Sequence, residues 1–332
     1  MNTSHFQAND VLEKEMEQKR DTPHISVLIV TWNRKKDILE TVHSVYEQAY
    51  KDFEIIIVDN GSVDGTVDTL AASYPDVKLV ALPQNLGVSS GRNAGIAIAK
   101  GEIIFCLDSD ASLGQDSLLE LTKKFQAEPD IGVINSKIVS AHTGVIDGGP
   151  GWAYSERQKE HQDQEFLSWS FSEGGAAIRK EVFNKVGLFW DVLFFGCEGQ
   201  EFSLRVWDAG YKVLYFPRSI VYHRASPEKR MEGKERECQF LKNNLSIYIT
   251  RYPLWLLFLM GPLKIGAIVV RSIRRGYLKD VLRTLAEVAK SVPRLSKLRK
   301  PIRNDTALLY LKLLRQQGPL SWNLFSWIKS KI

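Results

Sequence analysis

Two acidic residues separated by a single serine, Asp108 and Asp110, have the types and spacing that most directly suggest chemistry. They follow an apolar run, 103–107, so both carboxylates would leave the last turn of a buried strand together. Two unpaired carboxylates are costly to keep in a crevice, and a hard divalent cation that also binds phosphate oxygens is a natural partner for them. The alternative is that the pair caps a helix over 112–125, although Ser112 could take that capping role.

The elements that must position this pair alternate regularly along the first third of the chain. Continuous apolar runs, typical of strands buried on both faces of a parallel sheet, cover residues 24–30, 53–58, 77–81 and 102–107. Helical spacing follows the first three runs, over residues 35–50, 64–73 and 89–99. This alternation predicts an α/β fold whose doubly wound, mostly parallel sheet is Rossmann-like.

Polar residues follow each predicted strand. They form four clusters, at residues 31–34, 59–66, 85–93 and 108–110. In a doubly wound sheet, ligands bind beyond the carboxyl ends of the strands, where such loops converge. We therefore expect one crevice that is lined by all four clusters.

A second group of acids lies near residue 200. A helix that begins near Glu198 would place Glu201 one turn further on and Arg205 four residues beyond it, so Glu201 and Arg205 are expected to form a structural ion pair. Glu198 would lie at the helix N-terminus, where the helix dipole keeps a carboxylate ionised. An ionised carboxylate suits a general base.

The order and separation of these motifs resemble the nucleotide-sugar-dependent glycosyltransferases of family 2, which have the GT-A fold. The matching stretches are ISVLIVTWNR at 25–34, EIIIVDNGS at 54–62, NLGVSSGRNAG at 85–95 and LDSD at 107–110. The resemblance covers roughly residues 24–225. Among the members of this family, the chain resembles bacterial polysaccharide and O-antigen enzymes, the rhamnosyltransferase-like ones included.

The resemblance implies a role for individual residues. Nucleotide contacts would come from the first three polar clusters, through Thr31, Asn33, Arg34, Asp59, Gly61, Arg92 and Asn93. Asp108 would meet the ribose, and with Asp110 it would bind Mg²⁺ or Mn²⁺, which neutralises the leaving diphosphate. His223 follows an apolar strand and would complete the metal site, although a lone histidine is as often a surface or core residue.

Two neighbouring glycines, Gly174 and Gly175, lie in a run at 172–180 that resembles the acceptor-side loop of the family. Glycine would let the backbone approach a sugar closely. A structural turn explains the pair equally well.

The general base is the point at which the chain departs from the family. The family usually has Glu-Asp at the helix start, with the Asp as base, and this chain has Glu198-Gly199. Glu198 is the preferred replacement, with Glu201 and Asp191 as alternatives. The run from Glu198 also resembles the polypeptide N-acetylgalactosaminyltransferases, which retain anomeric configuration. The Asp-Ser-Asp form and the short chain favour inversion, as in family 2.

Basic residues are concentrated towards the C-terminus. The 332 residues are 44% apolar and 25% charged, with a net charge of +5, which excludes a disordered chain, a disulfide scaffold and a coiled coil. Residues 264–303 hold twelve Lys or Arg against two acids, so the remainder is mildly acidic. We expect a mobile arm at 1–23, a GT-A domain at 24–230 and a basic, amphipathic helical extension at 231–332.

An apolar stretch within this extension suggests a membrane surface. It is interrupted by Gly261-Pro262 and Lys264, so it falls short of a spanning helix. With its basic flank, the segment 252–303 suits a helical hairpin or a helix lying in an anionic membrane surface. An ordinary core helix is the alternative. The basic residues match no nucleic-acid-binding module, so no nucleic acid partner is predicted.

Together, these patterns predict a metal-dependent glycosyltransferase of cell-surface polysaccharide synthesis. The donor would be UDP- or dTDP-linked, and the acceptor a glycan or a lipid-linked glycan. The alternative is a catalytically inactive scaffold that binds sugar nucleotides or glycans, which Gly199 keeps open. Residues 1–23 lack an apolar leader and the cysteine count is odd, so we expect a cytoplasmic protein at the inner face of the cell membrane.

Overall fold

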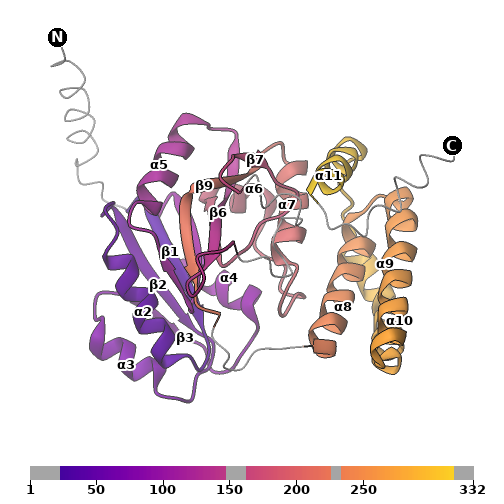
Figure 1. The fold of residues 1–332 in the computed structure, drawn as a ribbon, viewed down its shortest axis with the longest axis horizontal. Helices are drawn as coiled ribbons and strands as arrows, with labels where there is room; N and C mark the ends of the chain where they lie inside the picture. The colour runs from indigo at the N-terminus through magenta and orange to yellow at the C-terminus, as the bar shows by residue number, and fades with distance from the viewer. Residues whose placement is uncertain (1–22, 147–161, 226–232, 318–332) are drawn as a thin grey trace, which may run out of the picture.

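One mixed sheet organises the chain in this computed structural model, which describes residues 23–146, 162–225 and 233–317. Its strands are β1 (Ile25–Thr31), β2 (Phe53–Asp59), β3 (Lys78–Ala81), β4 (Ile103–Asp108), β5 (Ala111–Leu113), β6 (Ile131–Ser140), β7 (Phe166–Leu167), β8 (Gly175–Arg179) and β9 (Lys212–His223). Their order is β3-β2-β1-β4-β8-β6-β9-β5, with β7 paired to β9 (Figure 1). The arm predicted at 1–23 lies outside the described residues, apart from residue 23.

Helices cover both faces of this sheet (Figure 1). They are α2 (Lys35–Tyr46), α3 (Thr66–Ser73), α4 (Val88–Ile98), α5 (Ser117–Ala127), α6 (Lys180–Val186) and α7 (Glu198–Asp208). The helices α2, α3 and α5 share a core with one face, and α4, α6 and α7 share a core with the other. Successive residues of β1 alternate accordingly, since Val27 and Ile29 join the first core and Leu28 joins the second. The doubly wound arrangement is confirmed.

The first four predicted strands make the parallel half of the sheet. β1 pairs in parallel with β2 and β4, and β2 pairs in parallel with β3. The other half is mixed, because β8 runs antiparallel between β4 and β6 while β6 and β9 are parallel. The prediction of a mostly parallel sheet therefore holds for the first half only. At its carboxyl edge, the register places Thr31 beside Asp59, and Val30 beside Asp108.

The helix predicted directly after the acid pair begins later than expected. Ala111–Leu113 form β5, which pairs with the end of β9, and α5 begins only at Ser117. Ser112 therefore lies in a strand and caps no helix. Because a strand follows Asp108 and Asp110 as well, the capping alternative for these two acids is wrong.

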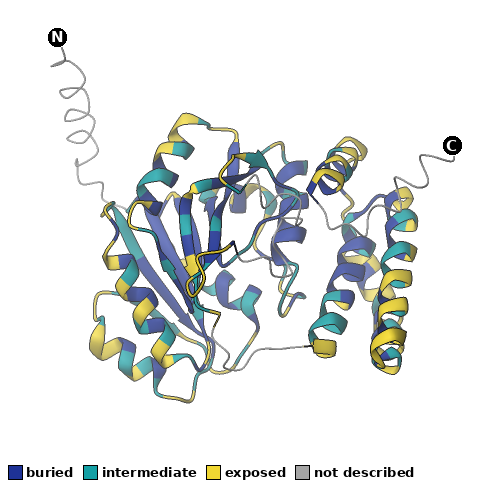
Figure 2. Cartoon of the chain, in the orientation of Figure 1, coloured by how far each residue is buried: buried dark blue, intermediate teal, exposed yellow. Residues whose placement is uncertain are grey.

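A second group of helices lies beside the sheet (Figure 1). α8 (Gly233–Arg251), α9 (Leu254–Arg275) and α10 (Leu278–Lys297) pack on one another, and α11 (Asn304–Gln317) returns to the sheet part. The return is fixed where Gln200 Nε2 donates to the Tyr310 hydroxyl at 3.2 Å. Figure 2 shows buried residues on the strands and exposed residues along α10.

The break predicted in α9 does not occur. Gly261 and Pro262 lie inside one continuous helix of 22 residues, so the interruption predicted there is wrong. The segment 252–303 instead forms two consecutive helices, α9 and α10, which are joined at Gly276-Tyr277 and pack on each other. By length and composition, α9 is the helix in the described residues that could cross a membrane. The core helix of a soluble protein passes the same test, but only 28% of the most apolar window of α9 is buried.

Candidate active site

An acidic cluster lies at the carboxyl edge of the sheet, where β4, β5 and β9 meet. Asp108 ends β4, Asp110 directly precedes β5, and His223 is the last residue of β9. The pairing of β5 with β9 brings His223 Nε2 to 3.5 Å from Asp110 Oδ1. One ligand atom from each of the three residues lies within 4.8 Å of the other two. The structure thus brings the three predicted metal ligands together.

The donor set of this cluster suits a divalent cation. Carboxylate oxygens are the ligands that Mg²⁺ and Mn²⁺ prefer, and an imidazole nitrogen is added here to two carboxylates. The Asp110 side chain is buried, and Arg34 Nη1 lies 2.6 Å from its Oδ2. The main-chain N–H of Arg224 donates to the Asp110 carbonyl at 2.9 Å, which fixes the turn before β5. The predicted residue Arg34 therefore lies at the acidic cluster.

Two buried polar atoms without partners among the described residues lie at the same edge of the sheet. Thr31 and Asp59 are register partners at the ends of β1 and β2. Thr31 Oγ1 and Asp59 Oδ1 are buried, and neither finds a hydrogen-bond partner in the described part of the chain, whereas Asp59 Oδ2 accepts the N–H of Ser62 at 2.8 Å. Buried polar atoms without partners are rare and call for an explanation such as a ligand.

Asn33 and Gly61 shape the loops around these atoms. The Asn33 backbone is left-handed, with φ of 51°, and its N–H donates to Ser62 Oγ at 2.7 Å. Its Oδ1 accepts the N–H of Val63 at 2.8 Å, so Asn33 joins the loop after β1 to the loop after β2. Gly61 has φ of 77°, and a Cβ there would lie 2.6 Å from the Cα of Gln84, which requires glycine.

The helix α4 brings Arg92 to the site but turns the polar atoms of Asn93 away from it. Arg92 is buried, its Nη2 lies 3.4 Å from Asp108 Oδ1, and its guanidinium lies 5.9 Å from the centre of the Phe189 ring. Asn93 Nδ2 donates to the Phe189 carbonyl at 2.9 Å, and its Oδ1 accepts the Phe189 N–H at 3.0 Å. The amide of Asn93 thus joins α4 to the backbone of Phe189, and its predicted contact with a nucleotide stays a prediction.

The two predicted acceptor-side glycines, Gly174 and Gly175, lie in close packing at the start of β8. A Cβ on Gly174 would collide with the carboxylate of Asp108, so this glycine allows the loop to pack against the acidic cluster. A Cβ on Gly175, in β8, would lie 2.7 Å from Ile138 Cδ1 in the core. The N–H of Gly175 donates to the Ser172 carbonyl at 3.2 Å, so Gly174 lies in a turn that leads into β8, as the turn alternative predicted.

One of the three acids that were considered as bases, Glu201, is badly placed for that role. Glu201 is fully buried, with Arg205 Nη2 at 2.6 Å and Arg251 Nε at 2.7 Å from its carboxylate oxygens. The predicted ion pair with Arg205 is confirmed, and the second arginine, from α8, was not expected. A carboxylate closed off between two guanidinium groups has no access to a substrate hydroxyl. Asp191 is exposed on the loop ahead of α7.

Glu198 is the first residue of α7, as the sequence predicted. Its side chain is 3% exposed, and its Oε1 accepts the N–H of Gly196 at 2.8 Å. Burial raises the pKa of Glu198, although Arg92 and the backbone N–H groups act in the opposite direction. The helix N-terminus therefore does not keep Glu198 as readily ionised as expected.

Sequence reasoning assigned no role to Glu173, yet its carboxylate lies beside the start of α7. Its Oε1 accepts the N–H of Gly199. Burial and the charge of Glu198 raise the pKa of Glu173. The available signal was an acid next to Gly174 in a chain that lacks the usual acid at position 199.

The helix α8 holds the loop that leads into Glu198. Asn243 Nδ2 donates to the carbonyls of Phe195 and Gly196 at 2.9 and 2.7 Å. The next residue, Asn244, directs its Nδ2 to Cys197 Sγ at 3.3 Å. The second group of helices is thus bonded directly to the acid-bearing end of α7.

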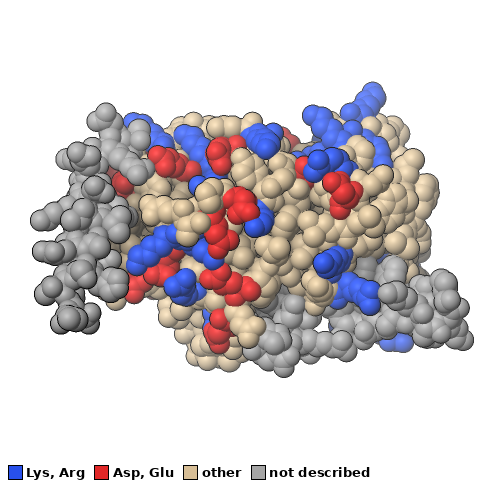
Figure 3. All heavy atoms as spheres, turned by 90° about the horizontal axis from the view of Figure 1, so that it is seen from above, with Lys and Arg blue, Asp and Glu red and all other residues tan. Residues whose placement is uncertain are grey.

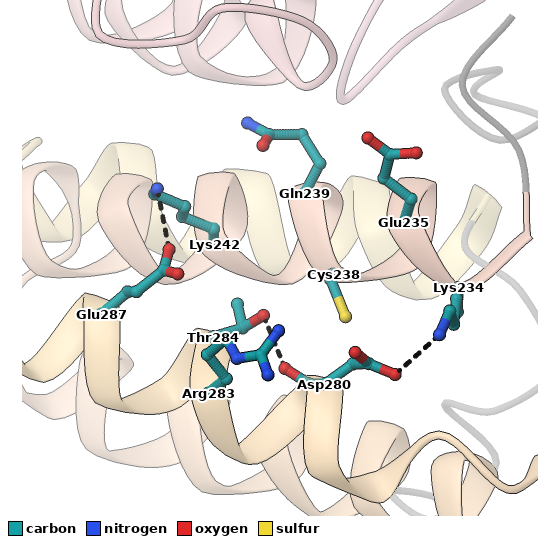
Figure 4. A pocket seen from close by; sticks show the side chains of 9 residues that line it. All are labelled: Lys234, Glu235, Cys238, Gln239, Lys242, Asp280, Arg283, Thr284 and Glu287. Atoms are coloured by element: carbon teal, nitrogen blue, oxygen red, sulfur yellow. Dashed lines mark hydrogen bonds and ion pairs between the residues drawn. The ribbon is translucent and has the colours of Figure 1, made fainter.

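A hollow of about 360 Å³ lies between α8 and α10, away from the acidic cluster (Figure 4). Its charged side chains are largely paired across the two helices, with Lys242 Nζ 3.1 Å from Glu287 and Lys234 Nζ 3.2 Å from Asp280. Thr284 Oγ1 donates to the Asp280 carbonyl within α10 at 2.9 Å. These contacts join α8 to α10, so we assign the hollow a structural role.

A doubly wound sheet with an Asp-x-Asp pair and a histidine at its carboxyl edge is the arrangement of the GT-A class of glycosyltransferases. Comparison with protein families agrees, because residues 26–187 match glycosyl transferase family 2. This part of the chain is a family 2 glycosyltransferase domain.

Three known proteins show how far the similarity extends. The chain is 32% identical over 162 residues to a succinoglycan biosynthesis protein of Rhizobium meliloti, covering 48% of this chain and 44% of that one. The crystal structure of GalNAc-T7 with UDP, GalNAc and Mn²⁺ has a TM-score of 0.59 at 19% identity, covering 82% and 58%. A mannosyltransferase of Pyrobaculum calidifontis, in complex with GDP-Man and Mn²⁺, has a TM-score of 0.52 at 18% identity, covering 98% and 88%. These two structures share the fold, and the chain spans about half the length of the curated relatives it matches.

Proposed function

We propose that this protein transfers a sugar from a nucleoside-diphosphate donor, UDP- or dTDP-linked, to a hydroxyl of a glycan or lipid-linked acceptor. The observation that carries the proposal is the convergence of Asp108, Asp110 and His223 within 4.8 Å at the carboxyl edge of the sheet. The family 2 match and the similarity to a succinoglycan biosynthesis protein support a role in cell-surface polysaccharide synthesis.

Each part of the site has a task in this reaction. Thr31 Oγ1 and Asp59 Oδ1 bind the nucleoside, because both are buried atoms without partners in the described chain, at the carboxyl ends of β1 and β2. Arg92 holds Asp108 in place, and Arg34 does the same for Asp110. A Mg²⁺ or Mn²⁺ ion held by Asp108, Asp110 and His223 supplies positive charge that neutralises the diphosphate as it leaves.

Inversion at the anomeric carbon is part of this proposal. An inverting transferase needs one carboxylate to take the proton of the incoming hydroxyl. Two carboxylates lie at the start of α7. Glu198 is the first residue of the helix, and Glu173 accepts the N–H of Gly199.

The first prediction concerns donor binding. With Mn²⁺ present, we expect one of UDP-glucose, UDP-N-acetylglucosamine, UDP-galactose, dTDP-rhamnose or GDP-mannose to stabilise the protein. Ligand at a hundredfold excess over Kd adds about 2.7 kcal/mol, which raises Tm by about 5 °C in a protein of this size. Differential scanning fluorimetry measures the shift, and chelation of the metal with EDTA should abolish it. If every donor leaves Tm unchanged with both metals, the proposal fails.

Gly199 favours a second candidate, a scaffold that binds sugar nucleotides without turnover. An assay for free nucleotide distinguishes the transferase from the scaffold. A transferase releases nucleotide from the stabilising donor, although slowly when water is the acceptor. Stabilisation by a donor without any nucleotide release, even with glycan or lipid acceptors added, would favour the scaffold.

We also propose that α9 lies in an anionic membrane surface at the inner face of the cell membrane. An exposed apolar stripe follows the four-residue spacing of the helix, through Leu254, Phe258, Pro262, Gly266, Val270 and Ile273. Phe258 is 73% exposed. Helix α9 contains no acidic residue, and Arg271, Arg274 and Arg275 lie at its C-terminal end. Apolar side chains beside cations match an interface of acyl chains and anionic headgroups.

The charge distribution supports a membrane contact through the end of the molecule that contains α9. On the face drawn in Figure 3, Asp and Glu are interspersed with Lys and Arg over the sheet half, and basic side chains gather at the opposite, helical end. A lipid-linked acceptor in the membrane would then lie near the same end of the molecule as α9. This arrangement brings a membrane-held substrate to a peripheral enzyme.

The second prediction tests the stripe with Phe258→Asp. We expect this change to lower the partition coefficient on vesicles of phosphatidylglycerol and phosphatidylcholine at least about tenfold, because a buried Phe contributes roughly 1.5–3 kcal/mol. Vesicle co-sedimentation measures the partitioning. Leu308→Asp is the matched control, because Leu308 is 61% exposed but lies on α11, away from the stripe. Equal binding by Phe258→Asp and the wild type would refute the membrane contact.

A further inference from the structure

The start of α7 is built around a glycine. A Cβ on Gly199 would collide with the main-chain carbonyl of Phe171 and lie 2.7 Å from Glu173 Oε1. The segment containing Phe171 and Glu173 therefore occupies the space that a side chain at position 199 would need. The Glu173 carboxylate takes the N–H of Gly199 as its hydrogen-bond donor.

We infer that Glu173 is the base that takes the acceptor proton, in place of the acid that position 199 lacks. This inference rests on the proposed transferase function and assigns its proton-transfer residue. In the reaction, the acceptor oxygen bonds to the anomeric carbon as its proton passes to the Glu173 carboxylate. The bond from that carbon to the diphosphate oxygen breaks, and its electron pair leaves with the nucleoside diphosphate.

The backbone on both sides of Glu173 fixes the position of its carboxylate. The Ser172 N–H donates to Asn135 Oδ1 at 3.1 Å, and Asn135 belongs to β6. The Gly174 carbonyl accepts the N–H of Asp108 at 3.2 Å. Glu173 is thus held one residue from the strand end that carries the proposed metal ligand, on rigid elements of the sheet.

Accessibility distinguishes Glu173 from the other acids near this helix. A base must touch the hydroxyl that it deprotonates. Glu198 is 3% exposed and Glu201 is completely buried, whereas Glu173 is partly exposed. Of these three residues, Glu173 is the one that retains exposed surface.

The charged groups near Glu173 act on its pKa in opposite directions. Desolvation and the charge of Glu198 raise the pKa of Glu173, the charge of Asp108 acts in the same direction, and Arg92 opposes them. The neighbouring thiols, Cys106 and Cys197, have pKa values raised by burial and stay neutral. Two close carboxylates share a proton because both cannot ionise freely. Glu198 then serves as the positioning partner and Glu173 as the base.

The third prediction uses Glu173→Gln and Glu198→Gln, assayed by nucleotide release to water from the stabilising donor with Mn²⁺. We expect Glu173→Gln to lower kcat by about 10²–10⁴-fold, the usual contribution of a general base, with donor-induced stabilisation kept. Glu198→Gln should lose far less, because an amide oxygen can still accept the Gly196 N–H. Glu47→Gln, on an exposed helix end, is the matched control.

The pH profile gives an independent readout in a variant that retains Glu173. Protonation of the base makes the wild-type rate fall as the pH is lowered. In Glu198→Gln the repelling charge is gone, so the pKa of Glu173 falls and the acid limb of kcat moves to lower pH. A merely structural role for Glu173 would leave this limb in place.

The folded state of Glu173→Gln can be checked separately. Because burial raises the pKa of Glu173, the wild type loses stability as the pH rises above the ordinary value of a glutamate, and glutamine removes this loss. We therefore expect the Tm of Glu173→Gln to exceed that of the wild type above neutral pH.

The outcomes separate the two proposals. If Glu173→Gln keeps the kcat of the wild type, Glu173 is not the base and the transferase function stands. The same conclusion follows if Glu198→Gln loses kcat while the acid limb of the pH profile shifts in Glu173→Gln. If the wild type releases no nucleotide and no donor stabilises it, the proposed function fails and the inference fails with it.

Discussion

Replacing Asp110 with Asn is expected to lower nucleotide release about a thousandfold, since a bound ion contributes several kcal/mol to the transition state. Asp110 is the residue of the acidic cluster that contacts both His223, at 3.5 Å, and Arg34, at 2.6 Å. An amide cannot supply the negative charge that holds a divalent cation. The change should also abolish the stabilisation that the donor gives in the presence of Mn²⁺.

Two measurements control this experiment. Asp163→Asn alters an aspartate that is 76% exposed and paired with Lys137, so it should leave both readouts unchanged. Circular dichroism of Asp110→Asn without donor shows whether the fold survives the loss of the Arg34 contact. A folded Asp110→Asn protein with wild-type release and an unchanged response to Mn²⁺ would remove the metal from the acidic cluster.

Replacing Glu201 with Gln should destabilise the fold by about 3–5 kcal/mol, the cost of breaking a buried ion pair from one side. Glu201 has no exposed surface, and Arg205 and Arg251 are 13% and 11% exposed, so water does little to screen them. Glutamine keeps the shape and one acceptor but leaves two guanidinium groups without a counter-charge. Urea unfolding measures the free energy.

The matched control for Glu201 is Glu287, which pairs with Lys242 across α8 and α10. Both side chains of that pair are about half exposed, so Glu287→Gln should change the free energy of unfolding by at most about 1 kcal/mol. Comparable losses in the two variants would show that the arrangement around Glu201 contributes no more than a surface pair.

The pattern of strands and polar clusters predicted the parallel half of the sheet and the edge at which Thr31, Asp59 and Asp108 meet. These elements are local, and the carboxyl ends of parallel strands must share one edge. The order of β8, β6 and β9 was not predictable in the same way, because their pairing is antiparallel in part and joins segments far apart in the chain. A helix was predicted to start at Ser112, where the structure has β5. The reason is again a long-range pairing, because β5 forms by pairing with β9.

Within the site, the sequence predicted which residues form the acidic cluster. It did not predict which polar side chains bond to the backbone instead of facing the site. The family resemblance implied that Asn93 contacts the nucleotide, and only the fold reveals that its amide also bonds to the backbone of Phe189. Glu173 was passed over because its importance depends on Gly199, 26 residues later, which leaves room for it. A residue that acts by occupying another's space has no signature in its own sequence neighbourhood.

The contacts of α8 set the size of the smallest piece of this protein that could work alone. Asn243 secures the carbonyls of Phe195 and Gly196, and Arg251 neutralises Glu201. A fragment cut at the end of the family-matched region, residue 187, would lack α7 altogether, and one cut before α8 would leave Glu201 short of a counter-ion. Chimeras that exchange the remaining helices to redirect the protein to a different acceptor should therefore place their junction after residue 251.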